Sequence, residues 1–299
     1  MDLIGFMLRF KDDKTCENYL TKRLFPKDIS CSSCGCTQIY KLNTQTKYTL
    51  YKCSGCKDRF SILKNTIFEN SRIGLQKWFL SMFLFTTTAI SSIELGKKLN
   101  VTQKTAWFML QRLRESMGDN NSNMFDGLVE IDETYIGGKE KNKHSFKKIK
   151  GSQGGANKEM VFGTIQRGDV KKIKTVHMKN KSGANLRSEI TNNIQDGSTL
   201  YTDENRAYLP LKSKYDIHST IHSQNEYVKD KIIHTNTIEG FWGLFKRGYI
   251  GIYHYMSPKH LQKYLNEYTF RYNHKENRFD FLLGLTQNKR LTYKRLING

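Results

Sequence analysis

Two aspartates stand where two strand-like segments of this chain end. Asp132 follows the apolar residues 128–131, and Asp203 follows the β-branched and aromatic residues 199–202. Side chains of these types favour strands. A carboxylate at the end of a buried strand, with a glycine pair a few residues after the first of them, indicates a site at the edge of a sheet. One acid in such a place is common, so the interpretation depends on whether others join it.

A third acid lies in residues 234–246, which read HTNTIEGFWGLFK. On a helical wheel at 100° per residue, Glu239 and Lys246 fall almost on one line, two turns apart. The apolar side chains fall on the opposite side: Phe241, Leu244 and Phe245. Gly240 and Gly243 weaken the helix by roughly 1 kcal/mol each, which suggests that something bulky approaches the Glu239 side. The alternative is a surface charge pair beside two incidental glycines.

The order of the expected elements supports grouping these acids. We expect strands over residues 128–131, 160–167, 171–178 and 199–202 and a helix over about 183–194. Three strands, a helix, a strand and a later acidic helix are the order of the RNase H-like fold, of α/β (α+β) class, which brings three carboxylates to one sheet edge. Asp132, Asp203 and Glu239 occupy the three positions. Thirty-five residues separate Asp203 from Glu239, and Lys246 completes a DDE-plus-lysine pattern.

Three such carboxylates suit displacement at phosphorus. Two divalent ions about 3.5–4 Å apart activate the attacking oxygen and stabilise the leaving oxygen, and Mg²⁺ or Mn²⁺ takes hard oxygen ligands. The attacking group would be water for strand scission and a DNA 3′-hydroxyl for strand transfer. Lys246 would contact a DNA phosphate, and Asn236 is an auxiliary candidate. Glu133 and Glu204 are not counted as ligands, because adjacent strand residues point to opposite faces.

Four of the six cysteines form two pairs separated by eighteen residues, Cys31-x2-Cys34 and Cys53-x2-Cys56. Each pair can clamp one side of a tetrahedral zinc ion, and the loop between the pairs suits a small β-ribbon. In an intracellular chain zinc is favoured over disulfides. Cys16 is left over, and Cys36 is either a spare donor or a bystander. We expect one structural Zn²⁺ in a ribbon that docks nucleic acid or protein.

A helix-turn-helix pattern follows the cysteines. A short helix over residues 91–99 leads through a turn to Thr102, a good N-cap for a helix that runs from Gln103 to Arg114. Gln103 and Lys104 are the candidates for reading base edges. An ordinary three-helix bundle gives the same pattern, and the ribbon beside it favours DNA binding.

The charge of the chain points to the same partner. Its 299 residues carry 49 Lys and Arg against 28 Asp and Glu, a formal net charge of +21, which indicates a polyanion such as nucleic acid. A basic stretch without periodicity predicts a mobile loop that contacts DNA phosphates, or else a solvated excursion. Its lysines are Lys139, Lys141, Lys143, Lys147, Lys148 and Lys150. No apolar run approaches the roughly 20 residues of a membrane span, so we expect a cytoplasmic, nucleoid-associated protein.

The chain resembles bacterial insertion-sequence transposases of the ISXO-like group, which are related to the Merlin transposases. The resemblance covers nearly the whole chain and rests on the zinc ribbon and on four segments: VEIDETYIGGKEKNKH, YTDENRAY, NEYV and HTNTIEGFWGLFKRGYIGIYHYMSPKHLQKYLNEYTFRYN. It implies a DDE transposase that holds two magnesium ions and moves a DNA segment by cut-and-paste or copying. Some relatives carry Asn or His at the position of the third acid. Because this chain carries Glu239 there, the resemblance implies an intact active site.

The domain boundaries and the alternatives follow from these elements. We expect the zinc ribbon in residues 1–64, the helix-turn-helix domain and linker in 65–124, and the catalytic domain with its C-terminal helix in 125–299. That helix should cover the sheet and carry Lys259, Lys263 and Arg271 outward. A transposase should act on element ends and target DNA as a homodimer or larger oligomer. The alternatives are a DNA-binding regulator and an endonuclease that cuts without strand transfer.

Overall fold

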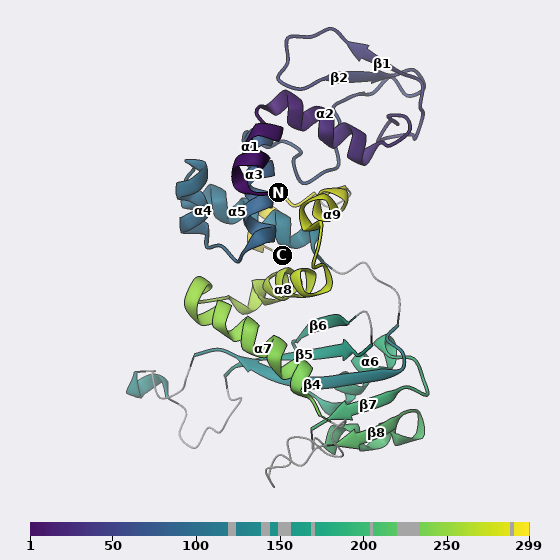
Figure 1. Cartoon of the computed structure of the whole chain (residues 1–299), viewed down its shortest axis with the longest axis vertical. Helices are drawn as coiled ribbons and strands as arrows, with labels where there is room; N and C mark the ends of the chain where they lie inside the picture. The colour runs from purple at the N-terminus through teal and green to yellow at the C-terminus, as the bar shows by residue number, and fades with distance from the viewer. Residues whose placement is uncertain are drawn as a thin grey trace. The chain divides into compact units, whose positions relative to one another are not determined.

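The computed structural model describes residues 1–118, 124–138, 144–148, 157–168, 171–203, 206–219, 234–287 and 290–298. The chain forms two compact units, one of Met1–Gly118 with His274–Gly299 and the other of Asp119–Asn273 (Figure 1). The sequence placed residues 274–299 with the catalytic domain, whereas the structure packs them with the N-terminal unit. Among the described residues, no helix is long and apolar enough to cross a membrane.

A five-stranded mixed sheet forms the centre of the second unit. Its strands are β4 (Leu128–Ile136), β5 (Glu159–Gln166), β6 (Lys172–Met178), β7 (Thr199–Thr202) and β8 (Asp216–Ser219), in the spatial order β6-β5-β4-β7-β8. The first three strands pair antiparallel, and β4, β7 and β8 pair parallel. This is the RNase H-like arrangement that the sequence predicted. Two details differ: β4 continues four residues past Asp132, and β8 was not expected.

Helices cover both faces of this sheet, as Figure 1 shows. α6 (Gly183–Asn193) and the 3-10 helix η3 (Arg206–Ser213) pack on the face that carries Val129 and Ile131. α7 (Asn236–Gly248) and α8 (Leu261–Asn273) pack on the face that carries Val161 and Ile165. The alternation of side chains along each strand therefore supplies two separate apolar cores. Short turns complete the described parts: η2 (Ser145–Lys147), the π-helix η5 (Tyr249–Tyr253) and η6 (Pro258–His260).

Two side chains on these helices lie differently from the prediction. Leu244 was expected in the core but is 49% exposed, and the buried face of α7 consists of Ile238, Phe241, Trp242, Phe245 and Gly248. Arg271 was expected to point outward but is largely buried, because it pairs with the fully buried Glu267 one helical turn earlier. The Tyr253 hydroxyl donates a hydrogen bond to the same carboxylate.

The first unit combines helices with a small β-ribbon. The helices are α1 (Leu3–Arg9), α2 (Asp13–Leu24), α3 (Leu75–Thr87), α4 (Ser92–Leu99), α5 (Gln103–Ser116), α9 (Arg278–Gly284) and α10 (Tyr293–Asn298). The ribbon consists of β1 (Ile39–Leu42), β2 (Leu50–Cys53) and β3 (Arg59–Phe60), all antiparallel. An aromatic cluster of Phe6, Phe10, Phe79 and Phe279 joins α1, α3 and α9. Phe279 explains why the C-terminal residues belong to this unit.

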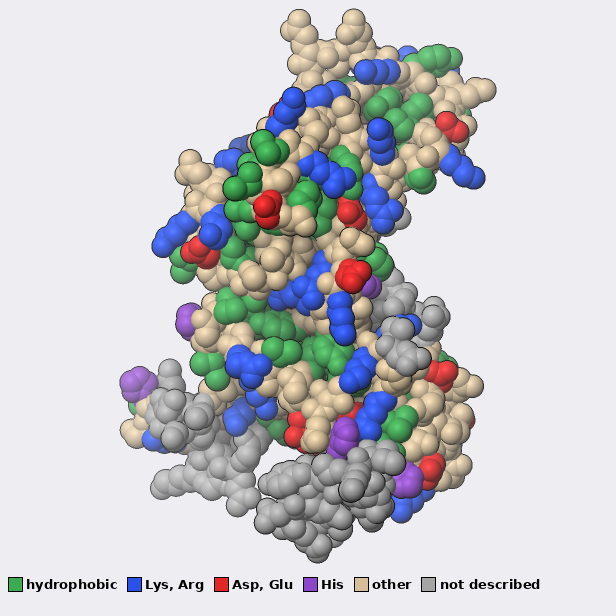
Figure 2. All heavy atoms as spheres, in the orientation of Figure 1, with side chains coloured by type: hydrophobic (Ala, Val, Ile, Leu, Met, Phe, Trp, Pro, Cys, Tyr) green, Lys and Arg blue, Asp and Glu red, His purple; other side chains and the backbone are tan. Residues whose placement is uncertain are grey.

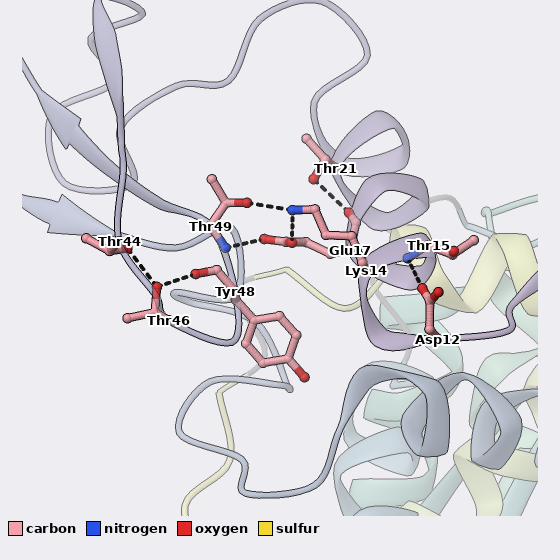
Figure 3. A network of polar contacts seen from close by, with 9 residues as sticks. All are labelled: Asp12, Lys14, Thr15, Glu17, Thr21, Thr44, Thr46, Tyr48 and Thr49. Atoms are coloured by element: carbon pink, nitrogen blue, oxygen red, sulfur yellow. Dashed lines mark hydrogen bonds and ion pairs between the residues drawn. The ribbon is translucent and has the colours of Figure 1, made fainter.

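One buried carboxylate connects the ribbon to α2. Glu17 is 2% exposed and accepts hydrogen bonds from the Thr49 backbone N–H at 2.6 Å and from the Lys14 ammonium group at 2.7 Å (Figure 3). Lys14 also donates to the Thr49 hydroxyl group. Because a buried charge is stable only when it is paired and hydrogen-bonded, these contacts hold the loop between β1 and β2 against α2.

Candidate active site

The register between β4 and β7 brings two of the three predicted acids together. The strands pair in parallel, with Glu130 opposite Tyr201. Two steps further along the same register, Asp132 lies opposite Asp203, which directly follows the last residue of β7. Carboxylate oxygens of both residues lie in one group whose members are all within 4.8 Å of one another. The strand pairing therefore sets the distance between the two aspartates.

The third member of that group is Glu133, which sequence reasoning had set aside. The alternation of side chains along a strand does not keep Glu133 away from Asp203. Because β7 ends at Thr202, β4 has no strand beside it on that flank from Asp132 onward. Side chains from both faces of β4 can then bend towards Asp203. The Tyr208 hydroxyl group, from η3, donates a hydrogen bond to Glu133. A tyrosine five residues after a strand-end acid was the available sequence signal.

Crowding of these carboxylates changes the protonation of one of them. Burial, followed by the negative charges of Glu133 and Asp203, raises the pKa of Asp132 from 3.8 to about 7. Glu239 adds a smaller contribution in the same direction, and the backbone N–H of Glu133 opposes the shift. A group of close carboxylates that resists full ionisation is the electrostatic setting in which a divalent cation is favourable.

Glu239 lies near this group without belonging to it. The negative charge of Glu239 contributes to the raised pKa of Asp132. Its carboxylate accepts a hydrogen bond from the Thr235 hydroxyl group at 2.8 Å. Glu239 and Lys246 are both exposed on α7. Asn236, the auxiliary candidate, is exposed at the first position of the same helix. Tyr201 and Trp242 are buried and pack in the interior.

The donor set of this site fits magnesium or manganese. Asp132, Glu133 and Asp203 offer carboxylate oxygens, the hard ligands that these ions prefer. Glu239 is the further acid that can approach, since it stands on a helix packed over the same strands. Glu204, the other acid that was set aside, lies outside the described residues.

Among the described residues, the four paired cysteines form a second group that could hold a metal ion. Their sulfur atoms all lie within 4.8 Å of one another, with Cys31 and Cys56 3.6 Å apart and Cys34 and Cys53 3.5 Å apart. Zinc–sulfur bonds of about 2.3 Å in a tetrahedron require sulfur atoms about 3.8 Å apart, so this group fits a structural Zn²⁺. Backbone N–H groups, first that of Ser33, lower the pKa of the Cys31 thiol to about 7, whereas the pKa of the Cys53 thiol is raised to about 12. Zinc binding would therefore have to release protons from this group.

Two helices of the first unit, α4 and α5, are joined by the short turn that the sequence predicted. α4 ends at Asn100, which adopts the left-handed conformation, and α5 begins after Thr102, whose hydroxyl group caps it by accepting the Thr105 N–H. A Cβ atom at Gly96 would meet the Val101 carbonyl oxygen at 3.0 Å, so the turn needs glycine there. Gln103 and Lys104 are exposed at the start of α5.

The structure describes little of the predicted basic loop. Lys139, Lys141, Lys143 and Lys150 lie outside the described residues, as does the side chain of Lys147, and Lys148 is exposed. On the face shown in Figure 2, lysine and arginine side chains are spread over each unit, with fewer acidic side chains among them.

An RNase H-like sheet with acids on β4, after β7 and on α7 is the arrangement of a DDE transposase. Residues 124–273 match the ISXO2-like transposase domain, and residues 11–59 match the transposase zinc-ribbon domain. The chain belongs to the ISXO2-like transposase family. It is also similar to an uncharacterized protein in transposable element ISH50 of Halobacterium salinarum, with 25% identity over 272 residues that cover 88% of this chain and 91% of that protein.

Proposed function

We propose that this transposase binds the ends of an insertion sequence and catalyses metal-dependent DNA strand cleavage and strand transfer. The observation that carries the proposal is the convergence of Asp132, Glu133 and Asp203, with the charge of Glu239 reaching the same place. Membership of a transposase family supports the reaction class.

In this mechanism the carboxylates of Asp132, Asp203 and Glu239 would hold two divalent ions, with Glu133 beside them. Such ions, when bound, activate the attacking oxygen and stabilise the leaving oxygen of an in-line displacement at phosphorus. Water attacks in the cleavage step, and the released 3′-hydroxyl group attacks target DNA in the transfer step. Lys246, exposed two turns after Glu239 on α7, would bind a phosphate beside the reacting bond.

The first unit would supply DNA recognition. α5 would present Gln103 and Lys104 to base edges in the major groove, and the zinc ribbon would add contacts of its own. The net charge of +21 would favour phosphate binding over the whole DNA segment. Because two element ends must be held together, we expect a homodimer or a larger assembly on DNA.

The test is a strand-transfer assay with element-end DNA and Mg²⁺ or Mn²⁺. Asp132→Asn and Asp203→Asn should each abolish cleavage and transfer while end binding stays near the wild-type level. The matched control is Asp216→Asn, because Asp216 is exposed on β8 of the same unit and pairs only with His218 among the described residues. Near wild-type transposition by either active-site variant would reject the proposal, and cleavage without joining would favour the endonuclease alternative.

A further inference from the structure

The fully buried Glu130 joins the strand that carries Asp132 to the helix that carries Glu239. Glu130 precedes Asp132 by two residues on β4, so both side chains leave the same face of the strand. One oxygen of Glu130 pairs with the Arg167 guanidinium group, and the other accepts the backbone N–H of Ile238 at 2.9 Å. Ile238 lies in the first turn of α7.

This contact replaces a cap that α7 does not make for itself. The first N–H groups of a helix need acceptors from outside the helix, yet the N-cap residue Thr235 makes no capping hydrogen bond. Its hydroxyl group donates to Glu239 instead. The negative charge of Glu130 is also favourable at the positive end of a helix. The start of α7 is therefore fixed by β4 itself.

Arg167 and His234 complete the connection from the other side. Arg167 directly follows β5 and uses one guanidinium nitrogen for Glu130 and another for the His234 carbonyl oxygen, at 2.6 Å. The His234 ring lies against the same nitrogen. The guanidinium group also lies over the Tyr201 ring, 4.8 Å from its centre. Such a fork of donors can hold two acceptors at once, which a lysine ammonium group does poorly.

We propose that Glu130, Arg167 and His234, here called the α7 clamp, are positioning residues that set the place of Glu239 relative to Asp132 and Asp203. The proposal rests on the proposed function in one respect, because it takes Glu239 as a metal-binding carboxylate. Active-site groups need supporting residues that fix them to within about 0.5 Å. The clamp would supply this support through its contacts to β4, to the end of β5 and to the start of α7.

The experiment measures Mn²⁺ binding by calorimetry on the full chain, beside the unfolding temperature and strand transfer. Glu130→Gln keeps the shape of the side chain, but an amide group has only one oxygen to accept a hydrogen bond. The Arg167 guanidinium group and the Ile238 N–H each need such an acceptor. Arg167→Lys keeps the charge and loses the fork. Each variant should weaken Mn²⁺ binding roughly 10-fold to 100-fold, as loss of a residue that orients metal ligands does. Binding of element-end DNA should stay near the wild-type level.

The control is Glu267→Gln, which breaks another ion pair of a fully buried glutamate in the same unit, with the largely buried Arg271 on α8. It should lower the unfolding temperature as the clamp variants do and leave Mn²⁺ affinity unchanged. A second control places Glu130→Gln in a Glu239→Gln background. Because the clamp acts through Glu239, it should cause no further loss of Mn²⁺ affinity there.

The outcomes separate the two proposals. If Glu239→Gln alone leaves Mn²⁺ binding and cleavage at the wild-type level, the assignment of Glu239 in the proposed function is wrong. If Glu239→Gln weakens Mn²⁺ binding and cleavage while Glu130→Gln and Arg167→Lys behave like Glu267→Gln, the clamp is only structural and the inference is overturned. An equal loss from Glu130→Gln in both backgrounds would also overturn it.

Discussion

The Tyr208 hydroxyl group donates a hydrogen bond to the Glu133 carboxylate. Burial, followed by the charge of Glu133, raises the pKa of Tyr208 well above its usual value, so the hydroxyl group stays protonated and can donate. Tyr208 stands on η3, which lies just after β7 in the chain. The same segment therefore supplies Asp203 and the tyrosine that holds Glu133 beside it.

The first prediction concerns this hydrogen bond. Tyr208→Phe should weaken Mn²⁺ binding, because Glu133 loses the donor that orients it, and Glu133→Gln should weaken it more. Loss of an orienting partner costs roughly 10-fold to 100-fold in metal affinity. Calorimetric titration of each variant checks the order of the two effects.

Tyr215→Phe is the matched control for that titration. Tyr215 is equally buried, and its hydroxyl group donates to the Ile194 carbonyl oxygen at 3.0 Å. The control should lose stability of about 1 kcal/mol and keep its metal affinity. Equal metal affinity in Tyr208→Phe and the wild type would contradict the orienting role of Tyr208, and equal affinity in Glu133→Gln would show that Glu133 is not a metal ligand.

A second prediction concerns pH. The folded metal-free protein keeps a proton on Asp132 up to a pKa of about 7, whereas the unfolded chain loses it near 3.8. Between these values the native state binds more protons, so stability falls as pH rises, by at most roughly 1.4 kcal/mol per unit from this group. The Asp132→Asn variant has no carboxyl group at this position, so this fall of stability with pH should be absent from it.

Thermal unfolding of the wild type and Asp132→Asn at several pH values measures this effect. The variant should gain stability relative to the wild type as pH rises from 4 to 7, and added Mn²⁺ should reverse the difference at pH 7. A difference that does not change with pH in metal-free protein would show that Asp132 ionises normally.

The sequence was sufficient to predict the order of β4, β5, β6, α6 and β7, because the side-chain pattern of each segment fits its element. Asp203 directly follows β7 as expected, whereas Asp132 lies inside β4. It was not sufficient for Glu133. Adjacent strand residues point to opposite faces, but side chains from both faces can approach one point where the neighbouring strand has ended, and only the structure reveals that β7 stops at Thr202. The β4 register, which no single segment encodes, then decides which acids meet.

The helical wheel of α7 was correct for its polar edge and wrong for one side of its apolar face. Leu244 precedes the buried Phe245, and adjacent residues on a helix are 100° apart. The buried stripe of α7 spans about 120° and is centred on Phe245 and Ile238, so Leu244 lies just beyond its edge. Arg271 was missed for a different reason, since a wheel cannot show that Glu267 is buried and needs a partner.

A third prediction concerns the zinc ribbon. The purified protein should contain one zinc ion per chain, and serine at Cys31, Cys34, Cys53 or Cys56 should remove it and unfold the ribbon. The buried core of the ribbon consists of Cys31, Cys53 and Phe60, so two of its three members are predicted metal ligands. A module this small depends on its metal.

Elemental analysis of reduced protein gives the zinc content. Cys16→Ala is the control, because Cys16 is fully buried on α2 and is outside the group of four; it should keep its zinc. Reduced wild-type protein without zinc would contradict the assignment.

A fourth prediction concerns the C-terminal residues. Phe279 lies 5.1 Å from Phe6 and 5.5 Å from Phe79, measured between ring centres. Phe279 is partly buried, so Phe279→Ala should destabilise the first unit by about 2 kcal/mol, less than the loss of a fully buried phenylalanine, and leave the sheet of the second unit unchanged. Hydrogen exchange should show the loss in α1 and α3, with β4 and β5 still protected.

The exposed Phe281 on the same helix is the control for this change. It is 42% exposed, so Phe281→Ala should cost less than Phe279→Ala. If Phe279→Ala increases hydrogen exchange more in β4 and β5 than in α1, residues 274–299 stabilise the second unit and not the first.

The last prediction separates three kinds of DNA contact by their dependence on salt. Changing Gln103 or Lys104 should reduce the preference for element ends over random duplex DNA, because base contacts specify sequence. Neutralising lysines in the basic loop, such as the exposed Lys148, should weaken binding to both DNAs alike. Each lost phosphate contact should flatten the slope of log affinity against log salt by about 0.9.

Lys246 should follow neither pattern. It is exposed two turns after Glu239 on the helix that the α7 clamp holds, so its phosphate would be the one beside the reacting bond. Lys246→Ala should therefore lower strand transfer far more than end binding. Lys259→Ala, at the start of η6 and away from the acids in the sequence, is the control and should lower neither strongly. Equal losses of end affinity and transfer yield in Lys246→Ala would make Lys246 an ordinary backbone contact, and α7 would then contribute only Glu239 to the site.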